Sequence, residues 1–257
     1  MEVTETPKKR GLFIIFGEAF RTGGKFTRAR DTPESITLQG LASQTHMILC
    51  QMIENKYNID IDLAFTTYTT PNYDLLKSYY KQLKYEFIHK ELIGQTNLVK
   101  NVLTNVNINQ YEFLFCFRFD MFLKHYFINN FNPFNNKITV SSVCFILCWK
   151  EHYIYPRVSD TMLLIPKEYF EIISEDFIFE HEIIGKYISK NMLRPSDFDF
   201  ILDTLHDSCT EWDYNPLYIL VSRVIQQKWH SYGWIFDKVS WEPIKWTTPI
   251  RYPDYEL

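Results

Sequence analysis

The segment YEFLFCFRFDMFLK, Tyr111–Lys124, carries two opposite charges inside an apolar run that is typical of a buried strand. Residues two apart in a strand point to the same face, so Arg118 and Asp120 are expected side by side, with Phe119 turned into the core. Burying both charges costs free energy unless they pair or meet a charged ligand. The segment therefore predicts either an ion pair at the rim of the core or part of a binding site.

Strand and helix patterns alternate in the chain before this segment. Apolar or β-branched runs predict strands at 11–17, 60–70 and 85–93, with 111–124 as the fourth, and apolar spacing predicts helices at 35–57, 73–84 and 96–106. The letters DTPES, 31–35, supply start signals for the first helix. This alternation predicts an α/β fold: a three-layer α/β/α sandwich with a mainly parallel central sheet.

The second half of the chain has a different pattern. Residues 137–149 and 157–170 read as strands with no helix between them, whereas 180–191, 197–209 and 215–229 read as helices. We therefore expect a helical C-terminal part. Neither an internal repeat nor a linker is evident, so one domain is expected over 10–250, preceded by a flexible tail at 1–9.

Composition narrows the classes of partner. The chain has 257 residues, 46% of them hydrophobic, and a net charge of −4, which argues against bulk electrostatic binding to nucleic acid. Its apolar runs are shorter than the roughly 18 to 20 residues that span a bilayer, so no membrane span is expected. Five cysteines without a CxxC pair indicate reduced thiols, and we expect a cytoplasmic protein.

Polar residues follow the first predicted strand in FGEAFRTGGKFTRAR, residues 16–30. Ligands of open α/β sheets bind beyond the carboxyl ends of the strands. Gly17 allows close backbone approach, and the guanidinium of Arg21 suits phosphate oxygens. The spacing matches neither a dinucleotide-binding fingerprint nor a P-loop. The segment predicts contact with a phosphate or a sugar, and a solvated basic loop is the alternative.

Four acidic or imidazole side chains are further candidates for chemistry. Asp120 has the hard oxygen ligands that Mg²⁺ or Mn²⁺ takes when it bridges a diphosphate. Asp160, in RVSDTMLLIP, is a candidate general base, a ligand of an acceptor hydroxyl, or a turn cap. Glu151 and His152, in WKEHY, place a base and an imidazole beside a stacking aromatic, with a surface loop as the alternative.

The order of these motifs resembles the GT-A type glycosyltransferases. The strand ending in FGEAFR, the strand ending in TTYTT, then FLFCFRFD and later RVSDTMLLIP follow that family's arrangement over roughly 11–170. The chain looks most like small cytosolic, virus-encoded or bacterial polysaccharide-type members in which the acidic metal motif is shortened to Arg-x-Asp.

The resemblance implies a nucleotide-sugar donor, a divalent metal (Mn²⁺ or Mg²⁺), and transfer of the sugar to a hydroxyl of a glycan or other acceptor. Arg118 stands where the family's motif usually has its first Asp, which puts two-carboxylate metal binding in doubt. Carried over by position, the donor side would be formed by Phe16, Gly17, Arg21, Thr66, Tyr68, Arg118 and Asp120, the metal ligand would be Asp120, and the acceptor-side acid would be Asp160, with Glu151 and His152 in reserve.

Two other classes of function remain open at the level of sequence. A sugar nucleotidyltransferase has a similar layered sheet and also uses carboxylates with Mg²⁺, but a stronger glycine-rich loop would be expected after the first strand. A non-catalytic carbohydrate-binding or assembly protein would keep the aromatic residues of WKEHYIYP and KWHSYGW without needing Asp120.

Overall fold

The computed structural model describes residues 8–22, 29–123, 125–140, 143–144, 157–158, 162–171, 198–200, 221–223, 234–236 and 243–245. Its helices are α1 (Pro33–Tyr57), α2 (Tyr73–Ser78), α3 (Gln95–Asn105), α4 (His125–Asn130) and the 3-10 turns η1 (Ile108–Gln110) and η2 (Lys167–Tyr169). Its strands are β1 (Arg10–Phe16), β2 (Arg21–Thr22), β3 (Ala29–Arg30), β4 (Asp60–Tyr68), β5 (Leu83–His89), β6 (Phe113–Arg118), β7 (Met121–Leu123), β8 (Ile138–Val140), β9 (Val143–Cys144), β10 (Arg157–Val158), β11 (Met162–Pro166), β12 (Phe198–Phe200), β13 (Val221–Arg223), β14 (Trp234–Phe236) and β15 (Pro243–Lys245).

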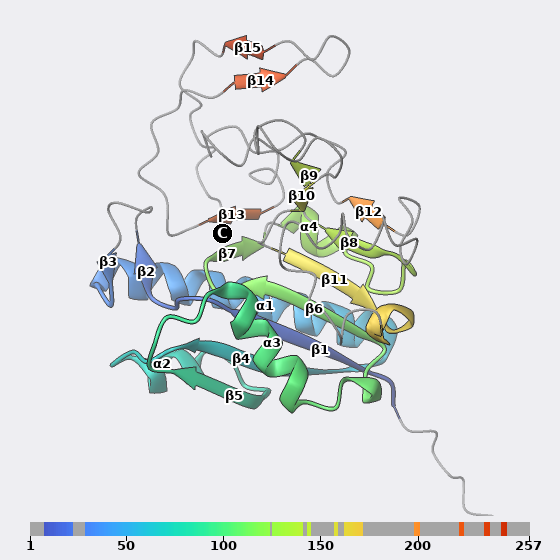
Figure 1. The fold of residues 1–257 in the computed structure, drawn as a ribbon, viewed down its shortest axis with the longest axis horizontal. Coiled ribbons are helices and arrows are strands. Elements are labelled where there is room, and N and C mark those ends of the chain that lie inside the picture. Colours follow the sequence, from blue (N-terminus) through green and yellow to red (C-terminus); the bar gives the residue numbers. More distant parts are fainter. Residues whose placement is uncertain are drawn as a thin grey trace, which may run out of the picture.

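The central sheet has the strand order β12-β8-β11-β6-β1-β4-β5 (Figure 1). β1 is parallel to both of its neighbours, β4 and β6, and β4 is parallel to β5. β11 lies antiparallel between β6 and β8, while β8 and β12 are parallel. The chain therefore runs from β1 outward to β4 and β5, and then returns to the other side of β1 as β6. The predicted, mainly parallel α/β sheet is confirmed.

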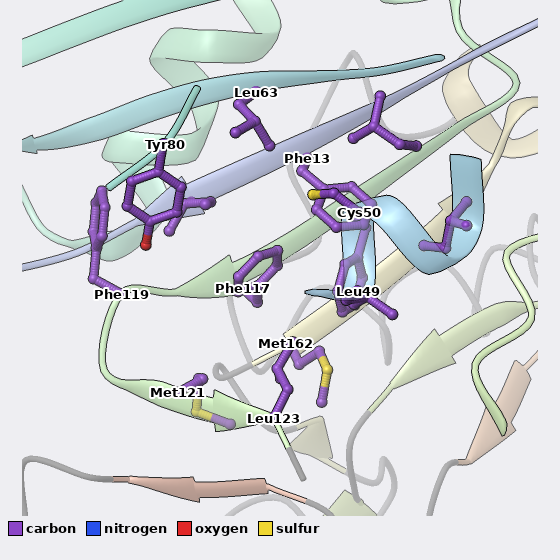
Figure 2. Packing of buried hydrophobic residues seen from close by; sticks show 14 of the residues in the cluster. Phe13, Leu49, Cys50, Leu63, Tyr80, Phe117, Phe119, Met121, Leu123 and Met162 are labelled. Atoms are coloured by element: carbon purple, nitrogen blue, oxygen red, sulfur yellow. The ribbon is translucent and has the colours of Figure 1, made fainter. Parts of the chain in front are cut away.

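The two faces of the sheet carry separate hydrophobic cores, because alternate strand residues point to opposite sides. In Figure 1, α3 lies in front of the sheet and α1 passes behind it. The first core packs α3 on Leu12, Ile14, Leu114 and Cys116, and the second packs α1 and α4 on Phe13, Ile15, Phe113, Phe115 and Phe117. Figure 2 shows part of the second core, where Phe13 and Phe117 lie near Leu49 and Cys50 of α1. Three layers result, as predicted.

Helix α1 begins and ends with standard local signals. The Thr32 side chain accepts a hydrogen bond from the Ser35 backbone N–H, Pro33 occupies the first turn, and Asn58 closes the helix at φ 52°. Its buried face is not simply apolar, and the apolar side chain of Ile48 is 51% exposed. The buried positions of the first half of the helix are mostly polar: Ser35, Gln39, Ser43, Thr45 and His46.

Several predicted elements differ from those observed. The helix expected at 73–84 ends at Ser78, and its last letters already belong to β5. Within the helices expected at 197–209 and 215–229, Phe198–Phe200 and Val221–Arg223 are strands, because they pair with β8 and β7 respectively. The helix expected at 180–191 and the rest of the other two lie outside the described residues. Among the described helices, none combines the length and apolarity that crossing a bilayer requires.

Candidate functional site

The chain turns sharply where β1 ends. Gly17 adopts φ +103°, a conformation that side chains with a Cβ rarely take. Its N–H donates to the Thr66 carbonyl at 3.1 Å, and its carbonyl accepts from the Thr67 hydroxyl at 2.7 Å. The turn after β1 is thus tied to the carboxyl end of β4.

The next part of the loop holds a buried aromatic residue in a left-handed conformation. Phe20 has φ 51° and a fully buried ring, and such a backbone costs about 1–3 kcal/mol for a residue other than glycine. Its N–H donates to Oε1 of Gln39 at 3.2 Å, and its carbonyl accepts from the Asp31 N–H at 2.8 Å. Surrounding contacts therefore enforce the conformation that presents the following residue, Arg21.

The carboxyl end of β6 meets this loop in a group of four charged side chains. The guanidinium of Arg118 donates two hydrogen bonds to Asp120, from Nε to Oδ1 at 2.7 Å and from Nη2 to Oδ2 at 2.5 Å. Arg21 donates from Nη2 to the same Oδ2 at 3.2 Å and from Nη1 to Oε2 of Glu18 at 3.1 Å. We call Glu18, Arg21, Arg118 and Asp120 the arginine–carboxylate cluster.

The arginine–carboxylate cluster is almost completely shielded from solvent. Side-chain exposure is 8% for Glu18, Arg21 and Arg118, and 2% for Asp120. The predicted ion pair of Arg118 and Asp120 is confirmed, and Phe119 between them is buried. Two positive charges balance two negative ones, which limits the cost of burial. Arg21 Nε is buried without a hydrogen-bond acceptor among the described residues, so this guanidinium keeps one unused donor.

The family resemblance implies a divalent metal with Asp120 as its ligand. Both oxygens of Asp120 already accept hydrogen bonds from guanidinium groups. Across the described part of the chain, no three or more His, Cys, Asp or Glu side chains gather where they could hold a metal ion. A cation at Asp120 would also face two positive neighbours. Both oxygens of Asp120 are thus already engaged by arginines, and Asp120 as a metal ligand stays a prediction.

The other donor-side candidates lie at the same level of the sheet. Phe16 is in register with Thr66 on one side and with Arg118 on the other, so β1 and β6 end at the same level while β4 continues to Tyr68. The Thr66 hydroxyl donates to the Leu98 carbonyl at 2.9 Å, which ties β4 to α3. Tyr68, two residues further along β4, is also buried. The contact of Thr66 and Tyr68 with a nucleotide remains a prediction.

A second polar group borders the carboxyl end of β4. Oδ1 of Asp31 accepts from the Thr70 hydroxyl and from Nδ2 of Asn72, the latter at 3.1 Å. Arg30 donates from Nη2 to the Thr69 carbonyl at 3.3 Å. These bonds hold Arg30 and Asp31, which lie just before α1, against the residues that follow β4.

Two residues of the site were not predicted from the sequence, and three predicted residues are not among those that the structure describes. Asp160, Glu151 and His152 are outside the described residues. Glu18 and Gln39 were missed, because a polar residue in a loop gives no local sign that it will be buried and a single polar residue in a helix gives only a weak one. The spacing of Gln39, Ser43 and His46 on one face of α1 was the available signal.

No protein-family model matches the chain, nor does any curated protein. Among solved structures it is similar to 4-diphosphocytidyl-2C-methyl-D-erythritol synthase from Anaerococcus prevotii, with TM-score 0.44 and 11% identity over 75% of this chain and 88% of that one. The glycosyltransferase GlyE of Streptococcus pneumoniae gives TM-score 0.38 and 13% identity over 77% and 46% of the two chains. A mutant Drosophila beta-1,4-galactosyltransferase 7, in complex with manganese, UDP-Gal and xylobiose, gives 0.39 and 10% over 93% and 92%. Likeness at this level says nothing of which reaction the chain performs.

Proposed function

We propose that the protein is a glycosyltransferase that moves a sugar from a nucleoside-diphosphate sugar to an acceptor hydroxyl. The observation that carries the proposal is the place of the arginine–carboxylate cluster. The strand order reverses between β1 and β6, and ligands of open α/β sheets bind at such a reversal, beyond the carboxyl ends of the strands. The loop after β1 brings Arg21 there, and the end of β6 brings Arg118 and Asp120.

The two arginines are suited to the diphosphate of such a donor. A guanidinium presents several donors in a plane that matches phosphate oxygens, and it stays charged at any physiological pH. As the sugar–phosphate bond breaks, negative charge grows on the departing diphosphate, and fixed positive groups stabilise that charge. Arg21 and Arg118 are assigned this task, while Asp120 holds both guanidinium groups in position.

The acceptor side of the reaction requires removal of a proton if the transfer inverts the sugar's configuration. Asp160 is assigned as that base, with Glu151 and His152 in reserve, as the sequence predicts. A base in this position must come within about 3 Å of the acceptor hydroxyl, or within one water of it.

The proposal is tested with a panel of nucleotide sugars in a thermal-shift assay, with Mn²⁺ and with EDTA. We expect a rise in melting temperature with UDP- or GDP-sugars that persists in EDTA, because the arginines neutralise the diphosphate. Shifts only with a nucleoside triphosphate and a sugar phosphate would replace the proposal with nucleotidyl transfer. No shift with any nucleotide would favour a binding or assembly protein.

A matched pair of variants locates the binding site. Arg21→Met removes a cluster arginine, whereas Arg10→Met removes an arginine at the other end of β1, where it pairs with Asp62 at 2.6 Å. We expect the nucleotide-sugar shift to disappear in the first variant and to remain in the second. Equal shifts in both variants would place the nucleotide away from the cluster.

A further inference from the structure

Gln39 of α1 joins the two loops that form the arginine–carboxylate cluster. Its side chain is fully buried, and both ends of its amide are engaged with backbone. Oε1 accepts from the Phe20 N–H at 3.2 Å, and Nε2 donates to the Phe119 carbonyl at 3.1 Å. A single amide therefore holds the residue before Arg21 and the residue before Asp120.

The contacts of Asp120 with Arg118 and with Arg21 differ in how much they depend on the two hydrogen bonds of Gln39. Arg118 is the last residue of β6 and Asp120 lies two positions later in the turn that follows, so their ion pair is a local contact. Arg21 lies 99 positions away, so its bond to Asp120 exists only if the loop after β1 and the end of β6 are held together. The left-handed backbone of Phe20, which the Gln39 oxygen helps to enforce, sets the direction in which Arg21 leaves the chain.

The same helix also holds the residue after Asp120. His46 lies seven positions after Gln39 on the same face of α1, and its Nε2 lies 2.6 Å from the Met121 carbonyl. Ser43, between them, bonds to the Gln39 carbonyl at 2.8 Å and to the Tyr80 hydroxyl at 2.9 Å. The carbonyls on both sides of Asp120 are therefore bound by side chains of α1. Figure 2 shows Tyr80 beside Phe119 at this point, with Met121 on the strand after the turn.

We propose that Gln39 is a positioning residue of the donor site, acting through the backbone of Phe20 and Phe119 to bring Arg21 onto Asp120. Glutamine is suited to this place because its amide accepts at one end and donates at the other. A methionine has similar length and volume but makes neither bond, and an asparagine is too short to keep both. The effect on ligand rests on the proposed function, whereas the effect on Arg21 does not.

The first test measures the arginines directly. The guanidinium signals of Arg21 and Arg118 are assigned by NMR with Arg→Lys variants at each position, and the rotation rate about each Nε–Cζ bond is measured. In Gln39→Met we expect the Arg21 group to rotate about tenfold faster, the factor that one lost hydrogen bond corresponds to. The Arg118 group should keep its rate. Unchanged rotation of Arg21, or equal acceleration of both groups, would overturn the proposal.

The second test uses inorganic pyrophosphate as a probe of the donor diphosphate, titrated by calorimetry. Gln39→Met is expected to weaken binding about tenfold, while the control Cys50→Ala, which alters a buried position of α1 away from both loops, keeps the wild-type Kd. If wild-type protein does not bind pyrophosphate, the proposed function loses support, but the NMR comparison still decides the role of Gln39. If Gln39→Met does not fold, Gln39→Asn replaces it with the same expected change at Arg21.

Discussion

Lowering the pH is expected to destabilise the protein through His46. Burial lowers the pKa of this imidazole from 6.5 to about 4, against the opposing influence of the Met121 carbonyl and the charge of Asp120. The neutral ring satisfies both of its neighbours: Nε2–H donates to the Met121 carbonyl at 2.6 Å, and Nδ1 accepts from the Tyr80 hydroxyl at 2.9 Å. A proton on Nδ1 would oppose that hydroxyl's hydrogen and bury a charge.

The size and sign follow from the two pKa values. The unfolded chain takes up a proton at His46 near pH 6.5, whereas the folded protein does so only near pH 4. The stabilisation is complete above pH 6.5 and is lost as the pH falls towards 4. Each pH unit in that interval lowers the free energy of unfolding by about 1.4 kcal/mol, so the total loss is about 3 kcal/mol.

Urea unfolding between pH 7.5 and pH 4 measures this loss. His46→Gln is the matched variant, because its amide can donate to Met121 and accept from Tyr80 but does not titrate. Its stability should decline with acid by about 3 kcal/mol less than that of the wild type. His89→Gln, at a partly exposed histidine, serves as the control and should retain most of the wild-type slope. Parallel curves for wild type and His46→Gln would refute the reasoning.

Three further predictions concern the site itself. Asp120→Ala leaves two buried arginines without this carboxylate and should lower the free energy of unfolding by about 3–5 kcal/mol in urea titrations. Unchanged stability together with normal turnover would show that Asp120 neither holds the arginines nor takes part in the reaction. Gly17→Ala introduces a Cβ at φ +103° and should cost about 1 kcal/mol or more, and a variant as stable as wild type would show that the turn adapts. Asp160→Asn should abolish sugar transfer while donor binding in a thermal-shift assay persists; full transfer activity would move the role of base to Glu151 or His152.

The strand β6 could be predicted from the local sequence pattern, whereas the placement of β11 in the sheet could not. The strands β1, β4 and β6 and the helix α3 follow from apolar runs and periodicity, because fully buried strands and one-sided helices need particular residues at particular spacings. The pair of Arg118 and Asp120 was predicted, but the single strand expected at 111–124 was wrong: β6 ends at Arg118, and Asp120 lies in the turn before β7. The antiparallel placement of β11 beside β6 could not be predicted in this way, because the pairing of two strands depends on both strands and not on the sequence of either one alone.

What the sequence determined by itself is therefore local: the strands β1, β4 and β6, the helices α1 and α3, their order, and the charged end of β6. Tertiary structure decided that Arg21 reaches Asp120 across 99 positions and that the first half of α1 buries Gln39 and His46. The reason is physical. An apolar residue gains free energy from burial against any apolar surface, whereas a polar residue is buried at low cost only where each of its hydrogen-bonding groups finds a partner. For Gln39 those partners are two backbone groups on distant loops, which come together only when the chain has folded.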